Sequence, residues 1–243
     1  MENLSINSSV KNWAEFSSSF SGPLSVPFYQ KHTLDVAQSL LGKILVVRGN
    51  PSYDWEDPRA EVVAGRIIET EAYRADDPAS HSARGETPRT AVMFGEPGIA
   101  YVYFIYGMYE MLNFVTEPKG SPGAVLIRAL EPVYGHSFMK VRRTSQKASG
   151  KEVISGKKPF DLTNGPGRLC RALGIQLSDN RQSLMGPRFL VVEDGFRPQS
   201  LSKSPRVGIR LGSEALWRFF ITDHPFVSRT PQNLKSIKMG CGI

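Results

Sequence analysis

The stretch YVYFIYGMYEMLNFVT, residues 101–116, decides the fold. Its aromatic run from Tyr101 to Tyr106 is typical of a strand, Gly107 permits a turn, and the segment from Met111 to Thr116 predicts a return strand. The sequence therefore predicts a hairpin here, and a middle of the chain that is mostly sheet.

Shorter elements are expected on both sides of the hairpin. Strand-like runs have β-branched residues or alternating polarity, and helix-like runs have apolar residues on one face. Thr33 is expected to cap the first helix, which Gly42 ends. Strands are expected at 43–48, 61–73, 124–130 and 189–193, helices at 34–41 and 165–173, and a closing core element at 216–220.

The length of the chain predicts one folded domain. With 243 residues and 40% apolar content, the chain can bury one sizeable core but is short for two full domains. We expect a disordered Ser-rich tail at 1–27, a domain at 28–230 and a C-terminal tail at 231–243. Within the domain, residues 142–158 have the Ser, Lys, Gly and Gln composition of a mobile basic loop.

The charge balance favours a polyanionic partner. Thirty Lys and Arg residues oppose 23 Asp and Glu residues, which gives a formal charge of +7 and a pI near 9.5. Charge alone does not separate DNA, RNA and a membrane surface. Because no apolar run reaches the roughly 20 residues of a membrane-spanning helix, we expect no membrane segment.

The two cysteines indicate an intracellular protein. Cys170 and Cys241 are far apart and have neither CxxC spacing nor a nearby histidine, which argues against a zinc site and against a disulfide framework. The amino terminus lacks the basic and apolar runs of a secretory signal. We therefore expect no metal and a reducing compartment, the cytoplasm or nucleoid of a bacterium or the nucleus of a eukaryote.

The run ETEAY brings two carboxylates together. The two-residue period of a strand puts Glu69, Glu71 and Tyr73 on one face of the sheet. Neighbouring carboxylates raise one another's pKa, and a carboxylate can take a proton from water, as glycosidic hydrolysis requires. The alternative is a solvated strand face, which is common for paired glutamates.

Aromatic side chains are denser in the hairpin than a core requires. Tyr101 and Tyr103 share one strand face, and Tyr106 lies where a hairpin tip residue would lie. Aromatic rings stack on nucleic-acid bases, and a large side chain at a tip can fill the gap left by an extruded nucleotide. The alternative is an aromatic hairpin that packs on the core.

Three further polar residues stand out. The guanidinium of Arg128 interrupts an apolar strand, so it must leave the core or find an acceptor there. The amide of Asn113 could read a base edge or satisfy backbone groups. His81, in the long loop from 74 to 89, could stack on a substrate, donate a hydrogen bond or meet solvent.

Taken in order, these motifs resemble the alkyladenine (3-methyladenine) DNA glycosylase family. The resemblance extends from about Phe28 to Arg229 and implies an α+β fold, a single mixed domain with a curved antiparallel sheet and peripheral helices. The motifs are ETEAY (69–73), ASHS (79–82), TPR (87–89), MF (93–94), YVYFIYGMY (101–109), RALEP (128–132), NGPGRLC (164–170) and HPFVS (224–228).

The resemblance assigns catalytic and base-binding roles. It implies that Glu71 is the general base that activates the attacking water, and that Arg128 helps to hold this water. Tyr73 would stack beneath the flipped base, while His81 and Tyr103 would close the pocket from the other side.

The resemblance also assigns the contacts that select and extrude the base. Asn113 would discriminate against the exocyclic amine of normal guanine by leaving no room for it. Tyr106 would be the wedge inserted into the duplex, and Met108 and Tyr109 would flank it.

The activity that this resemblance implies is base-excision repair without a cofactor. A monomer would flip a damaged purine (3-methyladenine, 7-methylguanine, hypoxanthine or ethenoadenine) out of double-stranded DNA and hydrolyse its N-glycosidic bond, leaving an abasic site. No lysine matches a catalytic position, so we expect no Schiff base and no strand cleavage.

Two other functions are open at this point. A module that binds damaged bases without cutting DNA would need only the stacking residues and the basic surface, although retention of Glu71 weighs against it. An RNA or tRNA base-binding enzyme fits the charge equally well, and competition between duplex DNA and structured RNA would separate the two.

Overall fold

One antiparallel sheet organises the part of the chain that the computed structural model describes, residues 12–144 and 159–240. Its main path runs β3-β4-β5-β2-β8-β7-β9, and β1 joins β2 to β6. The expected α+β fold with a single mixed domain is confirmed. The strands are β1 (Ile44–Val47), β2 (Val63–Arg74), β3 (Ala100–Ile105), β4 (Tyr109–Thr116), β5 (Gly123–Tyr134), β6 (Phe189–Val192), β7 (Leu201–Ser204), β8 (Arg218–Ile221) and β9 (Ile237–Met239).

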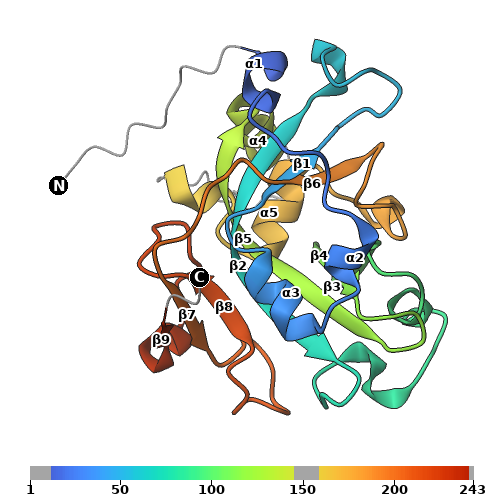
Figure 1. The fold of residues 1–243 in the computed structure, drawn as a ribbon, viewed down its shortest axis with the longest axis vertical. Helices are drawn as coiled ribbons and strands as arrows, with labels where there is room; N and C mark the ends of the chain where they lie inside the picture. The colour runs from blue at the N-terminus through green and yellow to red at the C-terminus, as the bar shows by residue number, and fades with distance from the viewer. Residues whose placement is uncertain (1–11, 145–158, 241–243) are drawn as a thin grey trace.

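Short helices surround this sheet. Helix α3 (Thr33–Ser39) contacts β2 and β5 and lies in front of them in Figure 1, whereas α5 (Pro166–Leu173) contacts β4 and β5. Within the described ranges, no helix combines the length and apolar character needed to cross a membrane. The other helices are α1 (Trp13–Ser17), α2 (Val26–Tyr29), α4 (His136–Thr144), and the 3-10 turns η1 (Pro58–Ala60), η2 (His81–Arg84), η3 (Ala91–Phe94), η4 (Pro159–Leu162), η5 (Leu177–Asp179) and η6 (Pro231–Lys235).

Strand β2 lies at the centre of the sheet because it pairs with β1, β5 and β8. Its apolar residues Ile67, Ile68 and Ala72 are fully buried in the main core, together with Val36 of α3 and Leu169 of α5. Apolar burial of this kind is the main favourable term in folding. The core therefore fixes the strand that carries ETEAY.

The pairing of β2 with β5 is irregular next to ETEAY. Glu69 lies opposite Ala129 and Thr70 opposite Ile127, so the register skips Arg128 on β5. An irregularity of this kind changes the direction of a side chain relative to the regular ladder. It brings the Arg128 guanidinium beside the carboxylates of β2.

The expected helix cap at Thr33 is wrong. Helix α3 begins at Thr33 itself, and His32 occupies the N-cap position without a side-chain cap. The Thr33 hydroxyl instead lies 2.9 Å from that of Thr116 and 2.8 Å from the Glu117 carboxylate. The side chain thus fastens α3 to the end of β4.

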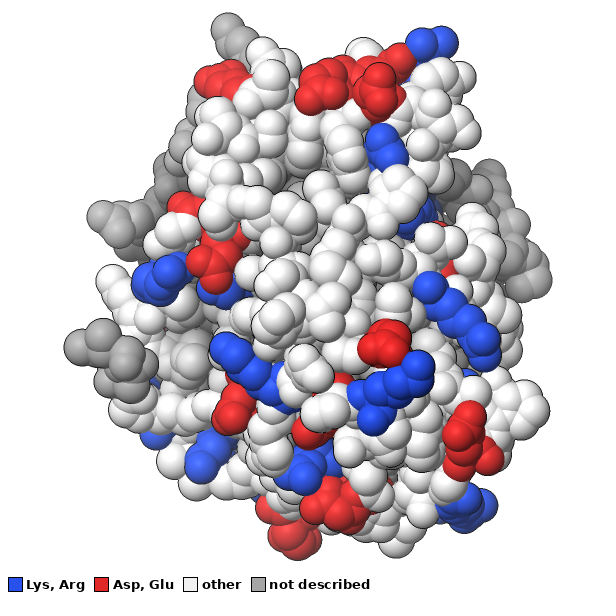
Figure 2. Space-filling view, turned by 45° about the vertical axis from the view of Figure 1, so that its right-hand side comes forward, with Lys and Arg blue, Asp and Glu red and all other residues white. Residues whose placement is uncertain are grey.

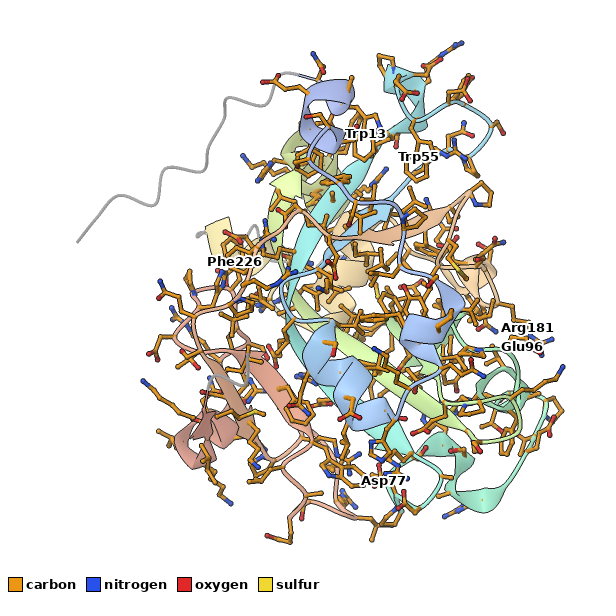
Figure 3. All side chains as sticks on the ribbon, in the orientation of Figure 1. Trp13, Trp55, Asp77, Glu96, Arg181 and Phe226 are labelled. Atoms are coloured by element: carbon orange, nitrogen blue, oxygen red, sulfur yellow. The ribbon has the colours of Figure 1, made fainter. Side chains whose placement is uncertain are left out.

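The expectation of a disordered tail over 1–27 differs from the structure for residues 12–27, while residues 1–11 lie outside the described chain. Trp13 of α1 is 7% exposed. Its ring stacks on Trp55 at a centroid distance of 5.8 Å and meets the edge of Tyr134 at 5.5 Å. Figure 3 shows Trp13 and Trp55 together at one end of the molecule, far from Asp77. The serine-rich composition of this segment led to the expectation of disorder and gave no sign of the aromatic contact.

The expected C-terminal tail at 231–243 also differs from the structure. Residues 231–235 form η6, and β9 pairs with β7 as an edge strand of the sheet. Of the expected mobile loop at 142–158, residues 142–144 end helix α4, and residues 145–158 lie outside the described chain. Cys241 lies outside it as well.

Candidate active site

Glu71 lies on β2 among polar partners and is fully buried. Its Oε2 accepts a hydrogen bond from the Tyr73 hydroxyl at 2.8 Å and lies 3.3 Å from Nη1 of Arg128. Its Oε1 accepts the backbone N–H of Val207 at 2.7 Å. Because the carboxylate is enclosed, the alternative of a solvated strand face is wrong.

Glu69 is a second fully buried carboxylate, and it has two arginine partners. Its Oε1 accepts Nε of Arg128 at 2.8 Å and Nε of Arg218 at 2.7 Å. Ser228 donates its backbone N–H to Oε2 at 2.7 Å and its hydroxyl to Oε1 at 2.6 Å. Burial alone would raise the pKa of Glu69, but the two guanidinium groups and Ser228 outweigh burial and lower that pKa. Glu69 therefore stays ionised.

Arg128 joins the two carboxylates. Burial disfavours its charged form, but Glu71 and Glu69 hold the pKa of Arg128 above its usual range. With Arg218, the group forms a buried cluster of two carboxylates and two guanidiniums, whose charges balance. The sequence left open whether the Arg128 guanidinium leaves the core or finds an acceptor there, and the structure shows the second outcome.

A pocket of about 340 Å³ lies beside Arg128 and Tyr73. Its size is within the range of small-molecule sites, which occupy roughly 300–1,000 Å³. Mostly aromatic and apolar side chains surround a few polar groups, as is usual for such sites. Of the candidate residues named from the sequence, Tyr73, His81, Tyr103, Tyr106, Asn113 and Arg128 line it. Glu71 is not among the lining residues, but Arg128, Tyr73 and Val207 connect it to them.

His81 has a defined tautomer in the pocket wall. Nη2 of Arg89 lies 3.3 Å from Nε2 of His81 and can only donate, so Nε2 is the acceptor. Nδ1 then carries the proton and donates a hydrogen bond to the Tyr101 hydroxyl at 3.0 Å. Burial, with a smaller contribution from Arg89, lowers the pKa of His81 to about 4. The ring is therefore neutral at physiological pH.

Two tyrosines complete the aromatic wall. The Tyr103 ring meets the edge of His81 at a centroid distance of 4.6 Å. Burial, followed by the charge of Glu71, raises the pKa of Tyr73, so its hydroxyl remains a proton donor to that carboxylate. Burial also raises the pKa of Tyr103. The wall facing the pocket is thus uncharged apart from Arg128 and the nearby Arg89.

Asn113 lies in the sheet surface of the pocket and is 3% exposed. Its Nδ2 donates to the backbone oxygen of Tyr101 at 3.2 Å and to that of Met111 at 3.5 Å. These bonds fix the amide group in one orientation. The backbone role that the sequence left open is therefore present, and the side chain still borders the cavity.

The tip of the hairpin between β3 and β4 carries three exposed large side chains, and through Tyr106, which lines the pocket, it forms the pocket mouth. Tyr106 is 79% exposed, Met108 61% and Tyr109 40%. Tyr106 has a φ of 54° and Gly107 a φ of 68°, the left-handed conformation of a tight hairpin turn. Tyr109 lies against α5, where Gly167 leaves room for its ring. The alternative of a hairpin packed wholly on the core is wrong for its tip.

Sequence reasoning missed several residues around the site. Val207, Arg206 and Asp77 were not singled out, and nothing in their local sequence sets them apart. Arg218 was also missed, while Ser228 stood within the HPFVS motif without a role. A carboxylate as deeply buried as Glu69 requires such partners, but spacing alone does not say where they are in the chain.

On the face drawn in Figure 2, positive charge is not concentrated in one patch. Basic and acidic side chains alternate there around an uncharged centre.

In residues 12–144 and 159–240, no group of three or more His, Cys, Asp or Glu side chains is arranged to hold a metal ion.

Comparison with known proteins identifies relatives over most of the chain. The family model for methylpurine-DNA glycosylase matches residues 27–225. A protein of Prosthecochloris aestuarii is 43% identical over 205 residues, which cover 83% of this chain and 89% of the relative. One from Bacillus cytotoxicus is 44% identical over 216 residues, covering 84% and 98%, and one from Alkaliphilus oremlandii is 43% identical over 209 residues, covering 83% and 96%. All three carry the provisional name of 3-methyladenine DNA glycosylase.

Proposed function

The chain belongs to the methylpurine-DNA glycosylase family, and from this premise we propose that it hydrolyses the N-glycosidic bond of damaged purines flipped out of duplex DNA. The observation that carries the proposal is the position of Glu71, a buried carboxylate held by Tyr73, Arg128 and Val207, all three of which line an aromatic pocket. A solely base-binding pocket would not need a carboxylate in that place.

Glu71 acts as the general base in this mechanism. Each carboxylate oxygen has two acceptor positions, and among the described residues Oε1 uses one of them, for Val207. A water that enters from the pocket takes the second position, and Arg128, which lines the pocket, helps to hold this water there. Glu71 removes a proton as the water oxygen bonds to the anomeric carbon, and the base leaves with the electrons of the N-glycosidic bond.

The pocket holds the extruded base between aromatic surfaces. Tyr73 stacks on one face, and His81 and Tyr103 close the other. A neutral His81 adds no positive charge against a cationic base such as 3-methyladenine or 7-methylguanine. Hypoxanthine and ethenoadenine are neutral and must be protonated to leave, so the proposal covers both classes by different leaving-group chemistry.

Tyr106 is the wedge that occupies the gap in the duplex, and Met108 and Tyr109 flank it. The exposure of all three side chains, and the place of Tyr106 in the lining of the pocket, support this assignment. A weakly paired lesion flips most readily because its unstacking cost is smallest. Asn113, fixed by its two backbone contacts, excludes the exocyclic amine of normal guanine.

The reaction ends at an abasic site, because the proposed mechanism uses no amine nucleophile and forms no Schiff base. The protein acts as a monomer on double-stranded DNA. Trapping of a covalent protein–DNA adduct with borohydride would contradict this part of the proposal.

Single-turnover release of hypoxanthine from a duplex oligonucleotide, detected by alkali cleavage, tests the function. The native protein should excise the base, and Glu71→Gln should lose roughly 10²–10⁴ of the rate while retaining DNA binding, the range for a positioned general base. Glu96→Gln is the matched control, since Glu96 is an exposed carboxylate that pairs with Lys119 and does not line the pocket.

Failure of the native protein to excise hypoxanthine, 3-methyladenine or 7-methylguanine would overturn the proposal. Selective binding of damaged duplexes without excision would then favour the module that recognises damaged bases without cutting.

A further inference from the structure

Arg206 lies directly against the tyrosine that is proposed to stack on the base. Its guanidinium carbon is 4.6 Å from the centroid of the Tyr73 ring and 5.0 Å from that of Trp217. The Arg206 side chain is fully buried. Because Tyr73 lines the pocket and Arg206 does not, the guanidinium contacts the ring from the protein side.

A carboxylate and backbone groups fix this cation. Asp77, which is 1% exposed, forms a two-pronged ion pair with Arg206. Nη1 of Arg206 also donates to the backbone oxygen of Ala72 at 2.9 Å, and Nη2 to that of Gly212 at 3.4 Å. The guanidinium thus joins the end of β2 to two loops, and these contacts hold it against the Tyr73 ring.

A fixed cation on one face of an aromatic ring changes what the other face prefers. A ring face is negative and attracts one cation. A second cation on the opposite face meets a ring already polarised toward the first, and it is repelled by the first through a medium of low dielectric constant. A neutral base on that opposite face does not meet this repulsion.

We propose that Arg206 is a positioning residue that, through Tyr73, biases the pocket toward neutral damaged purines and against purines that carry a fixed positive charge. The bias rests on the proposed function, since it concerns the base held on Tyr73. Asp77 limits the bias, because its negative charge lies on the same guanidinium.

Equilibrium binding separates this bias from effects on the chemical step. The protein is used in the Glu71→Gln background, and one duplex sequence carries hypoxanthine, 7-methylguanine stabilised by a 2′-fluoro sugar, or guanine. The quantity measured is the ratio of the Kd for 7-methylguanine to the Kd for hypoxanthine. A partly misfolded preparation raises both constants by the same factor, so this ratio does not depend on the active fraction.

The two members of the ion pair should shift the ratio in opposite directions. Arg206→Met removes the cation and should lower the ratio on the order of ten-fold, whereas Asp77→Asn leaves the cation uncompensated and should raise it. Arg206→Lys keeps a charge and should stay closer to the native ratio than Arg206→Met. General damage to the loops would move the Arg206→Met and Asp77→Asn ratios in the same direction.

Each remaining outcome has a defined meaning. Lesion-selective binding with an unchanged ratio, or a shift of both variants in one direction, would overturn the role of Arg206 and leave the proposed function intact. Equal affinity of the parent Glu71→Gln protein for all three duplexes would overturn the proposed function, and the role of Arg206 with it.

Discussion

The inner side of the pocket and its mouth are built in opposite ways. The inner cluster, Glu69, Glu71, Arg128 and Arg218, is almost completely removed from solvent, and hydrogen bonds and ion pairs join its members. The mouth, Tyr106, Met108 and Tyr109, exposes large apolar side chains to solvent. The inner cluster thus keeps charged groups away from water, whereas the mouth leaves apolar side chains exposed to water.

This difference predicts that substitutions in the inner cluster change the stability of the fold, whereas substitutions at the mouth change DNA binding. Removing a charge from the inner cluster leaves its partner buried and uncompensated, which is costly for the fold. Removing a side chain from the mouth exposes little that was buried, so the fold should hardly respond. The following predictions test that separation.

The largest effect on the fold is expected for Glu69→Gln. Arg128 and Arg218 would both lose their shared counter-ion, and breaking a buried pair costs about 3–5 kcal/mol. Urea denaturation should show this loss in the free energy of unfolding, while Glu96→Gln should stay within about 0.5 kcal/mol of the native protein. Equal stability of the two variants would erase the distinction between the inner cluster and the surface.

The pH dependence sharpens this prediction. Folding lowers the pKa of Glu69, so its stabilising contribution is complete above the ordinary glutamate pKa, about 4.3, and is lost as the pH falls through the folded value. The stability difference between the native protein and Glu69→Gln should therefore narrow below about pH 4.

A smaller effect, on binding alone, is expected for Tyr106→Ala. The free energy of unfolding should change by less than about 0.5 kcal/mol, because the side chain is exposed. The affinity for hypoxanthine-containing duplex should fall by ~1–3 kcal/mol, the usual contribution of one aromatic side chain that stacks on a base. If Tyr106→Ala lost stability but kept its affinity for the duplex, the binding role assigned to the mouth would be wrong.

The smallest effect is expected from His81 in the aromatic wall of the pocket, whose titration should leave the excision rate unchanged near neutral pH. His81 has its pKa lowered to about 4 by burial and then by Arg89, so its ring should remain neutral from pH 6 to pH 8 and cause no step in the excision rate. An unfolded histidine titrates near 6.5, so the contribution of His81 to stability is present above that pH and is lost as the pH falls toward 4. NMR titration of the ring would check this, and a midpoint near 6.5 would contradict it.

Local sequence patterns predicted the part of the site that depends on strand geometry. The two-residue period of β2 put Glu71 and Tyr73 on one face. A charged residue within an apolar strand singled out Arg128 as a side chain that must leave the core or find an acceptor there. The turn at Gly107 identified the hairpin whose tip carries Tyr106. Each of these inferences depends only on residues within a few positions of one another.

The parts that were missed depend on distant contacts. Arg206 and Asp77 are 129 residues apart, and Val207 reaches Glu71 across 136 residues. No local sequence pattern indicates that residues so far apart in the chain are in contact. The aromatic contact of Trp13 was missed for the same reason, because its partners Trp55 and Tyr134 lie far along the chain.

The left-handed backbone of Tyr106 has a consequence for the natural variation that this hairpin can accept. A residue with a Cβ atom is disfavoured at a φ of 54° by roughly 1–2 kcal/mol, a cost that glycine does not incur. Selection for thermal stability alone would therefore favour glycine at position 106. If Tyr106 is the wedge proposed above, the same substitution would remove the side chain that enters the duplex, so stability and DNA opening would be opposed at this one position.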